Sequence, residues 1–349
     1  MARIRFLDLT FAELREILLS WGEPKFRAGQ VWRWVYHNQV FDPAEMSNLP
    51  KELRQRLAQE FQFSLLQPLE RIASQDGLTE KVLFETEDAQ TVEAVLMRYR
   101  ERNSVCISSQ IGCPIGCPFC ATGQSGFVRN LSAGEIAAQV LYFSQILRGE
   151  RKRVTHVVLM GMGEPLLNFD AVWQAILSLN DPRGFGLGAR HFTISTAGVI
   201  PGIERLAGED LEVGLAVSLH APDDALRDVL VPINKRYPLK DLMTAVRAYI
   251  ERRGRRVTFE YALIAGVNDA EAQAQQTADL LQGLLCHVNL IPLNPTAGSS
   301  WRPSPVEKVR KFQEILEENG VRTTVRLRRG IDIQAGCGQL RHKHLLKEN

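Results

Sequence analysis

The chain has 349 residues, of which 45% are hydrophobic and 23% are charged, and its formal net charge is +2 at pH 7. This composition is typical of a globular protein that buries a core without disulfides, and so small a charge does not by itself indicate a nucleic-acid binder. No run of about 18 apolar residues occurs, and the segment from Met1 to Phe6 lacks the apolar stretch of a signal peptide. We therefore expect no membrane span and a cytoplasmic location, where thiols stay reduced.

Residues 1–75 are predicted to form a small helical accessory domain. Apolar residues recur at helical spacing from Phe11 onward, and Thr10 with Glu13 forms a capping box at the start of this first helix. Further helices are predicted over about 28–38 and 42–61. The domain carries basic and aromatic side chains, namely Lys25, Arg27, Arg33, His37, Trp21, Trp32 and Trp34. These side chains suit either a solvated helical bundle or an RNA-contacting surface.

Alternating apolar residues between Thr79 and Met97 predict a β-hairpin that turns at Glu87–Ala89. Glu93 lies in the second strand of this hairpin. We assign residues 76–102 to the hairpin, as a linker or extension that joins the helical domain to a catalytic domain over 103–349.

The catalytic domain alternates short β-rich runs with helical patterns. Strands are predicted over 105–109, 155–160, 191–195, 212–219, 257–263 and 287–291, with a final strand over 321–330. Helices are predicted over 133–147, 169–179, 202–206, 239–251, 270–281 and 306–318. Six βα units imply a parallel sheet with right-handed crossovers and are too few for a closed eight-fold barrel. The predicted fold class is α/β, an open partial (β/α)6 barrel.

The first strand is followed by three cysteines, Cys113, Cys117 and Cys120, with C-x3-C-x2-C spacing and no fourth cysteine nearby. Three thiolates suit a [4Fe–4S] cluster with one open iron, whereas structural zinc normally takes four ligands. A zinc loop with a distant fourth ligand is the alternative. Pro114 and Pro118 argue against a helix here and favour a loop that wraps a cluster.

Polar residues also follow the later strands, where ligands gather in parallel α/β folds. The segments are Gly161–Pro165, Ser195–Gly198, Ser218–Pro222 and Pro292–Pro295. Glu164 offers a carboxylate that could accept a hydrogen bond from an ammonium group. A single Ser or Asn at such a position is more often a helix cap than a ligand, so the prediction rests on the convergence of several loops.

The cysteine spacing, with Phe119 just before the last cysteine, resembles the signature of radical S-adenosylmethionine (SAM) enzymes. The flanking runs Ser108–Gly112 and Ala121–Leu131 are similar to the RlmN/Cfr family, which methylates adenosine carbons in RNA. The resemblance implies a radical-SAM barrel, a [4Fe–4S] cluster on the three cysteines, and two SAM molecules per turnover. It also implies a SAM site lined by Gly163, Glu164, Pro165, Ser195, Ser218, Leu219, His220 and Asn294.

The same resemblance assigns two further cysteines. Cys337 lies in a Cys-Gly-Gln-Leu element like that of the family and is expected to be exposed on a mobile loop. In the family scheme Cys337 takes a methyl group from SAM. The S-methyl group then loses a hydrogen and its carbon joins the adenine carbon. Cys106 finally attacks the Cys337 sulfur, which releases the RNA as a disulfide forms. Glu93 matches a family carboxylate proposed as proton acceptor, and Cys106 is the other candidate for that step. Cys286 matches no motif and is expected in the core.

The resemblance implies methylation of adenosine C2 in the peptidyl-transferase region of 23S rRNA and beside the anticodon of some tRNAs. Methylation of C8 of the same rRNA base, as in the Cfr branch, is the alternative, and a non-catalytic metal-containing RNA-binding module is a more distant one. Clustered arginines, among them Arg98, Arg102, Arg129, Arg256 and Arg326–Arg329, are candidates for phosphate binding. An electron donor such as flavodoxin or ferredoxin, no membrane partner and a monomeric state are expected.

Overall fold

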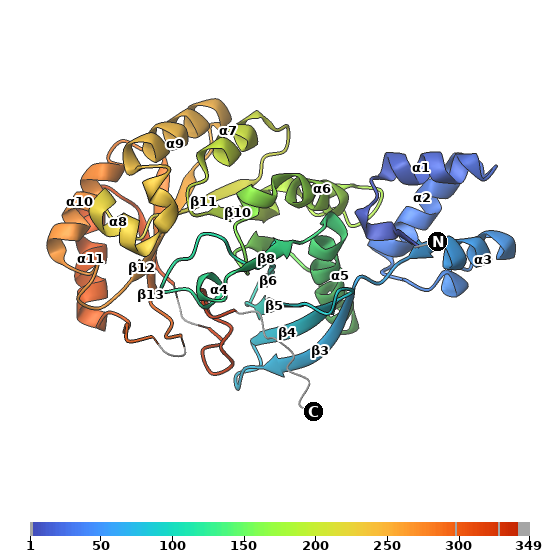
Figure 1. Cartoon of the computed structure of the whole chain (residues 1–349), viewed down its shortest axis with the longest axis horizontal. Coiled ribbons are helices and arrows are strands. Elements are labelled where there is room, and N and C mark those ends of the chain that lie inside the picture. Colours follow the sequence, from blue (N-terminus) through green and yellow to red (C-terminus); the bar gives the residue numbers. More distant parts are fainter. Residues whose placement is uncertain (1–2, 297–298, 327–328, 341–349) are drawn as a thin grey trace.

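The computed structural model describes residues 3–296, 299–326 and 329–340. A ten-stranded sheet with the order β14-β13-β12-β11-β10-β9-β6-β5-β4-β3 forms its centre (Figure 1). From β6 to β14 all neighbouring strands are parallel. These strands are β6 (Asn103–Cys106), β9 (His156–Leu159), β10 (Phe192–Thr196), β11 (Gly214–Ser218), β12 (Val257–Leu263), β13 (Cys286–Pro292) and β14 (Thr323–Val325). The six predicted βα units and the open barrel are confirmed, and β14 is shorter than the predicted final strand.

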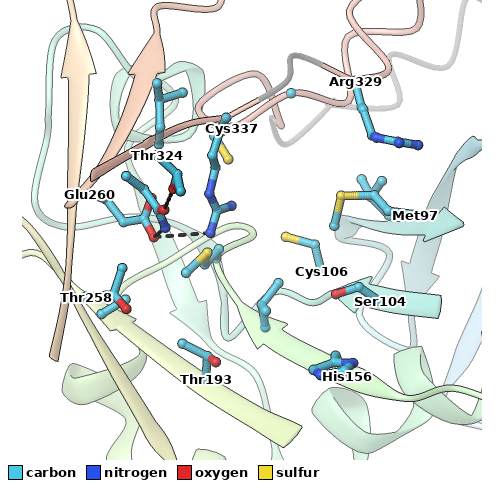
Figure 2. Close-up of a pocket in the computed structure, with 18 of the residues that line it drawn as sticks. Met97, Ser104, Cys106, His156, Thr193, Thr258, Glu260, Thr324, Arg329 and Cys337 are labelled. Atoms are coloured by element: carbon cyan, nitrogen blue, oxygen red, sulfur yellow. Dashed lines mark hydrogen bonds and ion pairs between the residues drawn. The ribbon is translucent and has the colours of Figure 1, made fainter. Parts of the chain in front are cut away.

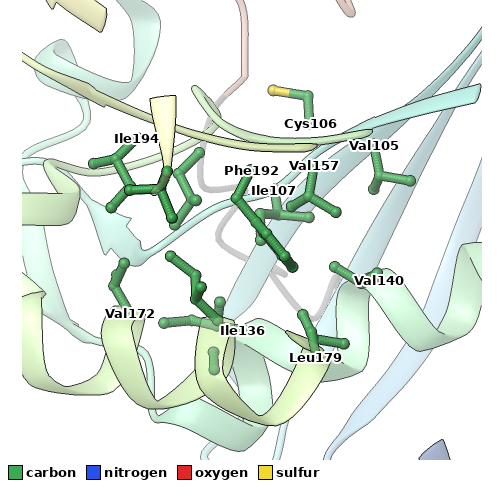
Figure 3. Packing of buried hydrophobic residues seen from close by; sticks show 14 of the residues in the cluster. Val105, Cys106, Ile107, Ile136, Val140, Val157, Val172, Leu179, Phe192 and Ile194 are labelled. Carbon is green, nitrogen blue, oxygen red and sulfur yellow. The ribbon is translucent and has the colours of Figure 1, made fainter. Parts of the chain in front are cut away.

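A layer of helices covers the outer face of the parallel strands (Figure 1). The helices are α5 (Ala133–Gly149), α6 (Phe169–Asn180), α7 (Ile200–Gly208), α9 (Leu239–Arg253), α10 (Glu271–Leu281) and α11 (Val306–Glu318). Val140 on α5 and Leu179 on α6 face Val105 and Val157 on the strands (Figure 3). Because side chains alternate along a strand, Cys106 points to the opposite face of the sheet from Val105. The inner face therefore receives every second residue, and the site lies there.

Three antiparallel strands extend the sheet beyond β6, namely β3 (Leu66–Ala73), β4 (Thr79–Thr86) and β5 (Thr91–Arg98). The predicted hairpin is confirmed as β4 and β5. The strand β3 falls within residues 1–75, the predicted helical domain, in a stretch after residue 61 for which no helix and no strand was predicted. Most residues of β3 are exposed, and the strand contains Pro68 and a bulge between Pro68 and Glu70, as is usual for an edge strand. Its sequence therefore lacks the apolar alternation by which strands are predicted.

The N-terminal helices are α1 (Phe11–Ser20), α2 (Phe26–Trp32), the π-helical turn η2 (Arg33–His37) and α3 (Lys51–Glu60). The capping box of Thr10 and Glu13 is confirmed. Trp32 is fully buried, with its ring centroid 4.3 Å from that of Tyr36, so this aromatic residue belongs to the core and is not a platform for RNA bases. The same hydrophobic core continues into the α/β part, and the backbone N–H of Gly134 donates to Asp8 Oδ1 over 2.6 Å.

Short elements complete the described chain. They are β1 (Ile4–Arg5), η1 (Phe6–Asp8), η3 (Pro43–Glu45), β2 (Phe61–Gln62), β7 (Gln110–Gly112), α4 (Ala121–Gln124), β8 (Phe127–Asn130), η4 (Pro165–Asn168), η5 (Ala189–His191), α8 (Asp224–Leu230) and η6 (Pro232–Lys235). The sequence did not predict α8 or the β7–β8 hairpin. Among the described residues, no helix combines the length and the apolar character needed to cross a membrane.

Candidate active site

A cavity of about 490 Å³ lies on the inner face of the sheet. Its wall is built from alternate residues of the strands, among them Cys106, Val158, Thr193, Thr258, Asn289 and Thr324 (Figure 2). A smaller cavity of about 170 Å³ lies at the C-terminal ends of the same strands. Met160, Glu260, Asn294 and Cys337 line both, so the two cavities adjoin.

The three clustered cysteines all line the smaller cavity. Their segment is a loop between β7 and β8, as predicted, and the backbone N–H of Cys113 donates to the carbonyl of Gly126 over 2.8 Å. Gly112 lies at φ +75°, and a Cβ atom there would meet the Gly126 oxygen at 1.9 Å, so only glycine fits this crossing. Burial raises the pKa of the Cys113 thiol to about 12, while N–H groups of Ile115 and Gly116 directed at it lower that pKa.

The chemistry of this donor set fits an iron–sulfur cluster. Three soft thiolates on one cavity wall, with backbone N–H groups beside a sulfur, are typical of such sites. Within the part of the chain that the structure describes, no group of three or more His, Cys, Asp or Glu side chains is arranged to hold a single metal ion. Cys113, Cys117 and Cys120 are the residues that would hold the cluster.

Glu164 lines the smaller cavity together with the three cysteines and is buried. Its Oε2 accepts from the backbone N–H of Ala197 over 2.7 Å and its Oε1 from that of Leu166 over 3.1 Å. Burial raises the pKa of this carboxyl to about 7, and these hydrogen bonds lower it. Two backbone donors leave lone pairs on both oxygens, so Glu164 can still accept from an ammonium group.

His220 is held as a neutral imidazole. Its backbone has φ +59°, and its Nδ1 accepts from the backbone N–H of Ala262 over 3.0 Å. Burial lowers the pKa of His220 to about 3, with a smaller contribution from the charge of Arg227. Because Nδ1 is an acceptor in the neutral ring, the proton lies on Nε2, which is then a hydrogen-bond donor.

The structure brings most of the predicted SAM-site residues to one place. Gly163, Glu164, Ser195, Ser218, His220 and Asn294 line the smaller cavity. Pro165 and Leu219 do not line either cavity. Pro165 opens the short helix η4, and the Leu219 side chain is buried in the core, because it alternates with Ser218 and His220 along the chain.

Cys337 is exposed, as predicted, and lines both cavities. Its loop is anchored from several sides, because Asn294 Nδ2 donates to the Cys337 carbonyl over 3.1 Å and the Ala121 N–H donates to the Gly338 carbonyl over 2.8 Å. The second bond joins the loop directly to the residue after Cys120. The fold thus places Cys337 beside the cysteine loop although more than two hundred residues separate them in sequence.

Cys106 and Cys337 face the same larger cavity as free thiols (Figure 2). Loss of hydration raises the pKa of both thiols, that of Cys106 to about 12, although the Cys337 residue as a whole is exposed, and the Arg326 guanidinium lowers both pKa values. Arg326 is fixed by Glu260, whose Oε1 lies 3.2 Å from Arg326 Nη2 and accepts from Asn289 Nδ2 over 2.9 Å. Cys286 is buried, as predicted.

Glu93 lies on β5 but lines neither cavity. Its Oε1 is 3.0 Å from Lys81 Nζ in a buried ion pair, and Lys81 Nζ also donates to the Gln334 carbonyl over 3.2 Å. Lys81 therefore connects Glu93 with the segment that leads to Cys337. Sequence reasoning missed Lys81, although a lysine in the middle of an apolar strand was a usable signal.

Arg328 lies outside the described residues, and six of the other candidate arginines fall into two groups. Arg98 pairs with Glu150 at 2.7 Å and Arg129 pairs with Asp88 at 2.7 Å, so these two are structural ion pairs. Four others line the larger cavity, namely Arg102, Arg256, Arg326 and Arg329.

The chain is similar to known proteins along nearly its whole length. The model of the radical SAM superfamily matches residues 107–278, and that of the ribosomal RNA large subunit methyltransferase N-terminal domain matches residues 4–63. The probable dual-specificity RNA methyltransferase RlmN of Chloroflexus aurantiacus is 50% identical over 98% of this chain and 94% of that protein. The corresponding protein of Geobacillus kaustophilus is 48% identical over 98% and 93%. A radical SAM methyltransferase from Sphaerobacter thermophilus superposes with a TM-score of 0.95 at 49% identity, covering 97% of this chain and 99% of that one.

Proposed function

Since the chain belongs to the RlmN family of radical SAM RNA methyltransferases, we propose that it methylates C2 of an adenosine in 23S rRNA and of the adenosine beside the anticodon in some tRNAs. The single observation that carries the proposal is the placement of Cys337. Its thiol faces the larger cavity together with Cys106, and it also lines the smaller cavity that the three clustered cysteines and Glu164 share. A methyl acceptor, a releasing thiol and a cofactor site thus adjoin.

The smaller cavity would hold the cofactors. When bound there, the [4Fe–4S] cluster and SAM supply the methyl group and the hydrogen-abstracting radical chemistry of the family. Glu164 would accept a hydrogen bond from the ammonium group of SAM, and His220 would donate one to SAM through Nε2–H. Gly163, at φ +101°, brings the backbone close to Gln110 and lets the chain pass the ligand without a side chain.

Cys337 acts as the nucleophile that receives the methyl group. The thiolate, and not the thiol, is the nucleophilic form of cysteine, so the guanidinium of Arg326 assists by favouring the charged form. The S-methyl group then loses one hydrogen atom, its carbon forms a bond to adenine C2, and the resulting adduct gives up one electron, which the bound cluster would be able to accept. A second SAM serves this hydrogen removal, so each turnover uses two.

Cys106 releases the product. Its sulfur attacks the Cys337 sulfur, and the bond from the Cys337 sulfur to the methylene carbon breaks as a Cys106–Cys337 disulfide forms. The electron pair of that bond stays with the methylene carbon, which takes up a proton to complete the methyl group of the released RNA. The proton on adenine C2 leaves to a base, for which Glu93 and Cys106 are the candidates, and of these two only Cys106 lines the cavity. An electron donor such as flavodoxin or ferredoxin reduces the protein between turnovers.

The proposal is tested by incubating the reconstituted protein with SAM, a reductant and unmodified 23S rRNA or tRNA, followed by mass spectrometry of the nucleosides. We expect 2-methyladenosine. Formation of 8-methyladenosine would place the reaction at C8, and no methylated adenosine under conditions in which the cluster is loaded would contradict the proposed function.

A further inference from the structure

Tyr99 lies at the larger cavity in a tight turn between β5 and β6, and two arginines stack on its ring. The Arg102 guanidinium carbon lies 4.3 Å from the ring centroid and that of Arg329 lies 4.4 Å from it. The backbone N–H of Tyr99 donates to the Arg102 carbonyl over 2.8 Å, which fixes the turn. We call this set of three residues the Arg–Tyr–Arg stack.

The stack brings together two segments that carry the reactive thiols. Arg102 comes just before β6, whose last residue is Cys106. Arg329 comes from the segment that leads to Cys337, and its Nη1 donates to the carbonyl of Arg98 over 3.1 Å. Figure 2 shows Arg329 above Met97, on the side of the cavity where Cys106 lies.

No carboxylate of the described residues forms an ion pair with either arginine of the stack. Among the described residues that line this cavity, Glu260 is the one carboxylate, and it pairs with Arg326. The charge of Arg329 contributes to lowering the pKa of Asp76, but the two side chains form no ion pair. Arg102 is also exposed. Arginines that serve the fold alone, such as Arg98 and Arg129, have carboxylate partners here.

This arrangement suits a phosphodiester. A guanidinium that lies flat on an aromatic ring loses side-chain freedom but keeps its N–H edge available, and that edge matches two phosphate oxygens. An adenine whose C2 reaches Cys337 must enter this cavity, so the backbone on either side of its nucleotide must pass the cavity rim.

We propose that Arg102 and Arg329, stacked on Tyr99, bind the phosphodiester that adjoins the target adenosine and so hold the RNA backbone while the base is inside the cavity. The inference rests on the proposed function, because it takes RNA as the substrate. It goes further in assigning one phosphate site to named residues that are separate from the SAM site.

The test measures binding and needs no turnover. The probe is a tRNA anticodon stem-loop with an adenosine beside the anticodon, compared with versions in which the linkage on one side or the other of that adenosine is a neutral methylphosphonate. Affinities are measured without SAM or reductant for the wild-type protein, for Arg102→Gln, for Arg329→Gln and for Arg310→Gln. Arg310 is an exposed arginine on α11 that makes no ion pair within the described residues, so it controls for the loss of one surface charge.

We expect one neutral linkage to weaken wild-type binding by about tenfold, the size of one lost charge-assisted contact. Arg102→Gln should weaken binding of the unmodified probe by a similar factor and lower the salt dependence of binding by about one phosphate contact. The affinity of this variant should be the same for the unmodified probe and for the probe with the neutral linkage that weakens wild-type binding. Inorganic phosphate at matched ionic strength should not compete with the RNA probe for binding, since a lone phosphate lacks the rest of the RNA. Specific competition by phosphate would instead assign a free-phosphate site and overturn the proposal.

Two results would overturn the inference while leaving the proposed function intact. One is a loss in Arg102→Gln no larger than in Arg310→Gln. The other is a neutral linkage that costs the wild type and Arg102→Gln equally. Failure of the proposed function is recognised separately, by the absence of methylated adenosine from wild-type turnover. Because Arg102 is exposed, its substitution tests the site even where Arg329→Gln, which removes an anchor to Arg98, also perturbs the loop.

Discussion

Replacement of Lys81 by methionine should strongly destabilise the protein. Lys81 and Glu93 are 7% and 1% exposed in their side chains, and their charged atoms are 3.0 Å apart. Removing one partner of a buried ion pair leaves the other charge uncompensated, at a cost of about 3–5 kcal/mol. The hydrogen bond from Lys81 to the Gln334 carbonyl is lost as well, so the Cys337 segment loses one of its anchors.

The assay is anaerobic urea unfolding followed by circular dichroism, with the double variant Lys81→Met/Glu93→Gln as the matched control. Removing both charges should recover most of the lost free energy of unfolding, because a buried amide costs less to desolvate than an unpaired buried carboxylate. A Lys81→Met variant that loses less than about 1 kcal/mol, or a double variant no more stable than the single one, would refute the reasoning.

The remaining predictions concern the reaction. Replacing Cys117 by serine should abolish the iron content of anaerobically reconstituted protein, which we expect to be about four irons for the wild type; metal analysis that finds zinc and no iron in the wild type would contradict the cluster. Replacing Cys106 by alanine should leave RNA covalently attached to Cys337, seen as a slow-migrating band on a denaturing gel, and multiple turnovers by this variant would remove Cys106 from the scheme. Arg326→Gln removes the charge that lowers the pKa of Cys337, so the already raised pKa of this thiol rises further. Because less thiolate is then present near neutral pH, methyl loading should slow by roughly tenfold for each pKa unit. Loading by this variant, followed by intact-protein mass spectrometry, should recover at higher pH; a profile that does not move would separate Arg326 from the thiol.

The periodic spacing of apolar residues predicted the repeating strands and helices of the α/β domain. Strands such as β12 and helices such as α11 have the bounds expected from periodicity, because each buries a regular apolar face. The cysteine loop also followed from spacing and from resemblance. Cys106 was expected near the start of a strand over 105–109, whereas it is the last residue of β6. The edge strand β3 did not, since Pro68 and its exposed residues give no apolar alternation.

Contacts between distant segments were beyond the reach of the sequence. The Lys81–Glu93 pair joins two strands and touches the chain near Gln334, more than two hundred residues later. The Arg–Tyr–Arg stack likewise needs Arg329 to fold back onto the turn at Tyr99. Leu219 was placed in the SAM site by the family resemblance, but its side chain is buried in the core.

The central claim is that the methyl carbon passes through Cys337 and loses a hydrogen on the way to adenine C2. The direct test supplies SAM whose transferable methyl group is fully deuterated and determines the mass of the methylated adenosine. The account predicts 2-methyladenosine whose methyl group retains two of its three deuterium atoms, and no product from Cys337→Ala. A product that retains all three, or that forms without Cys337, would contradict it.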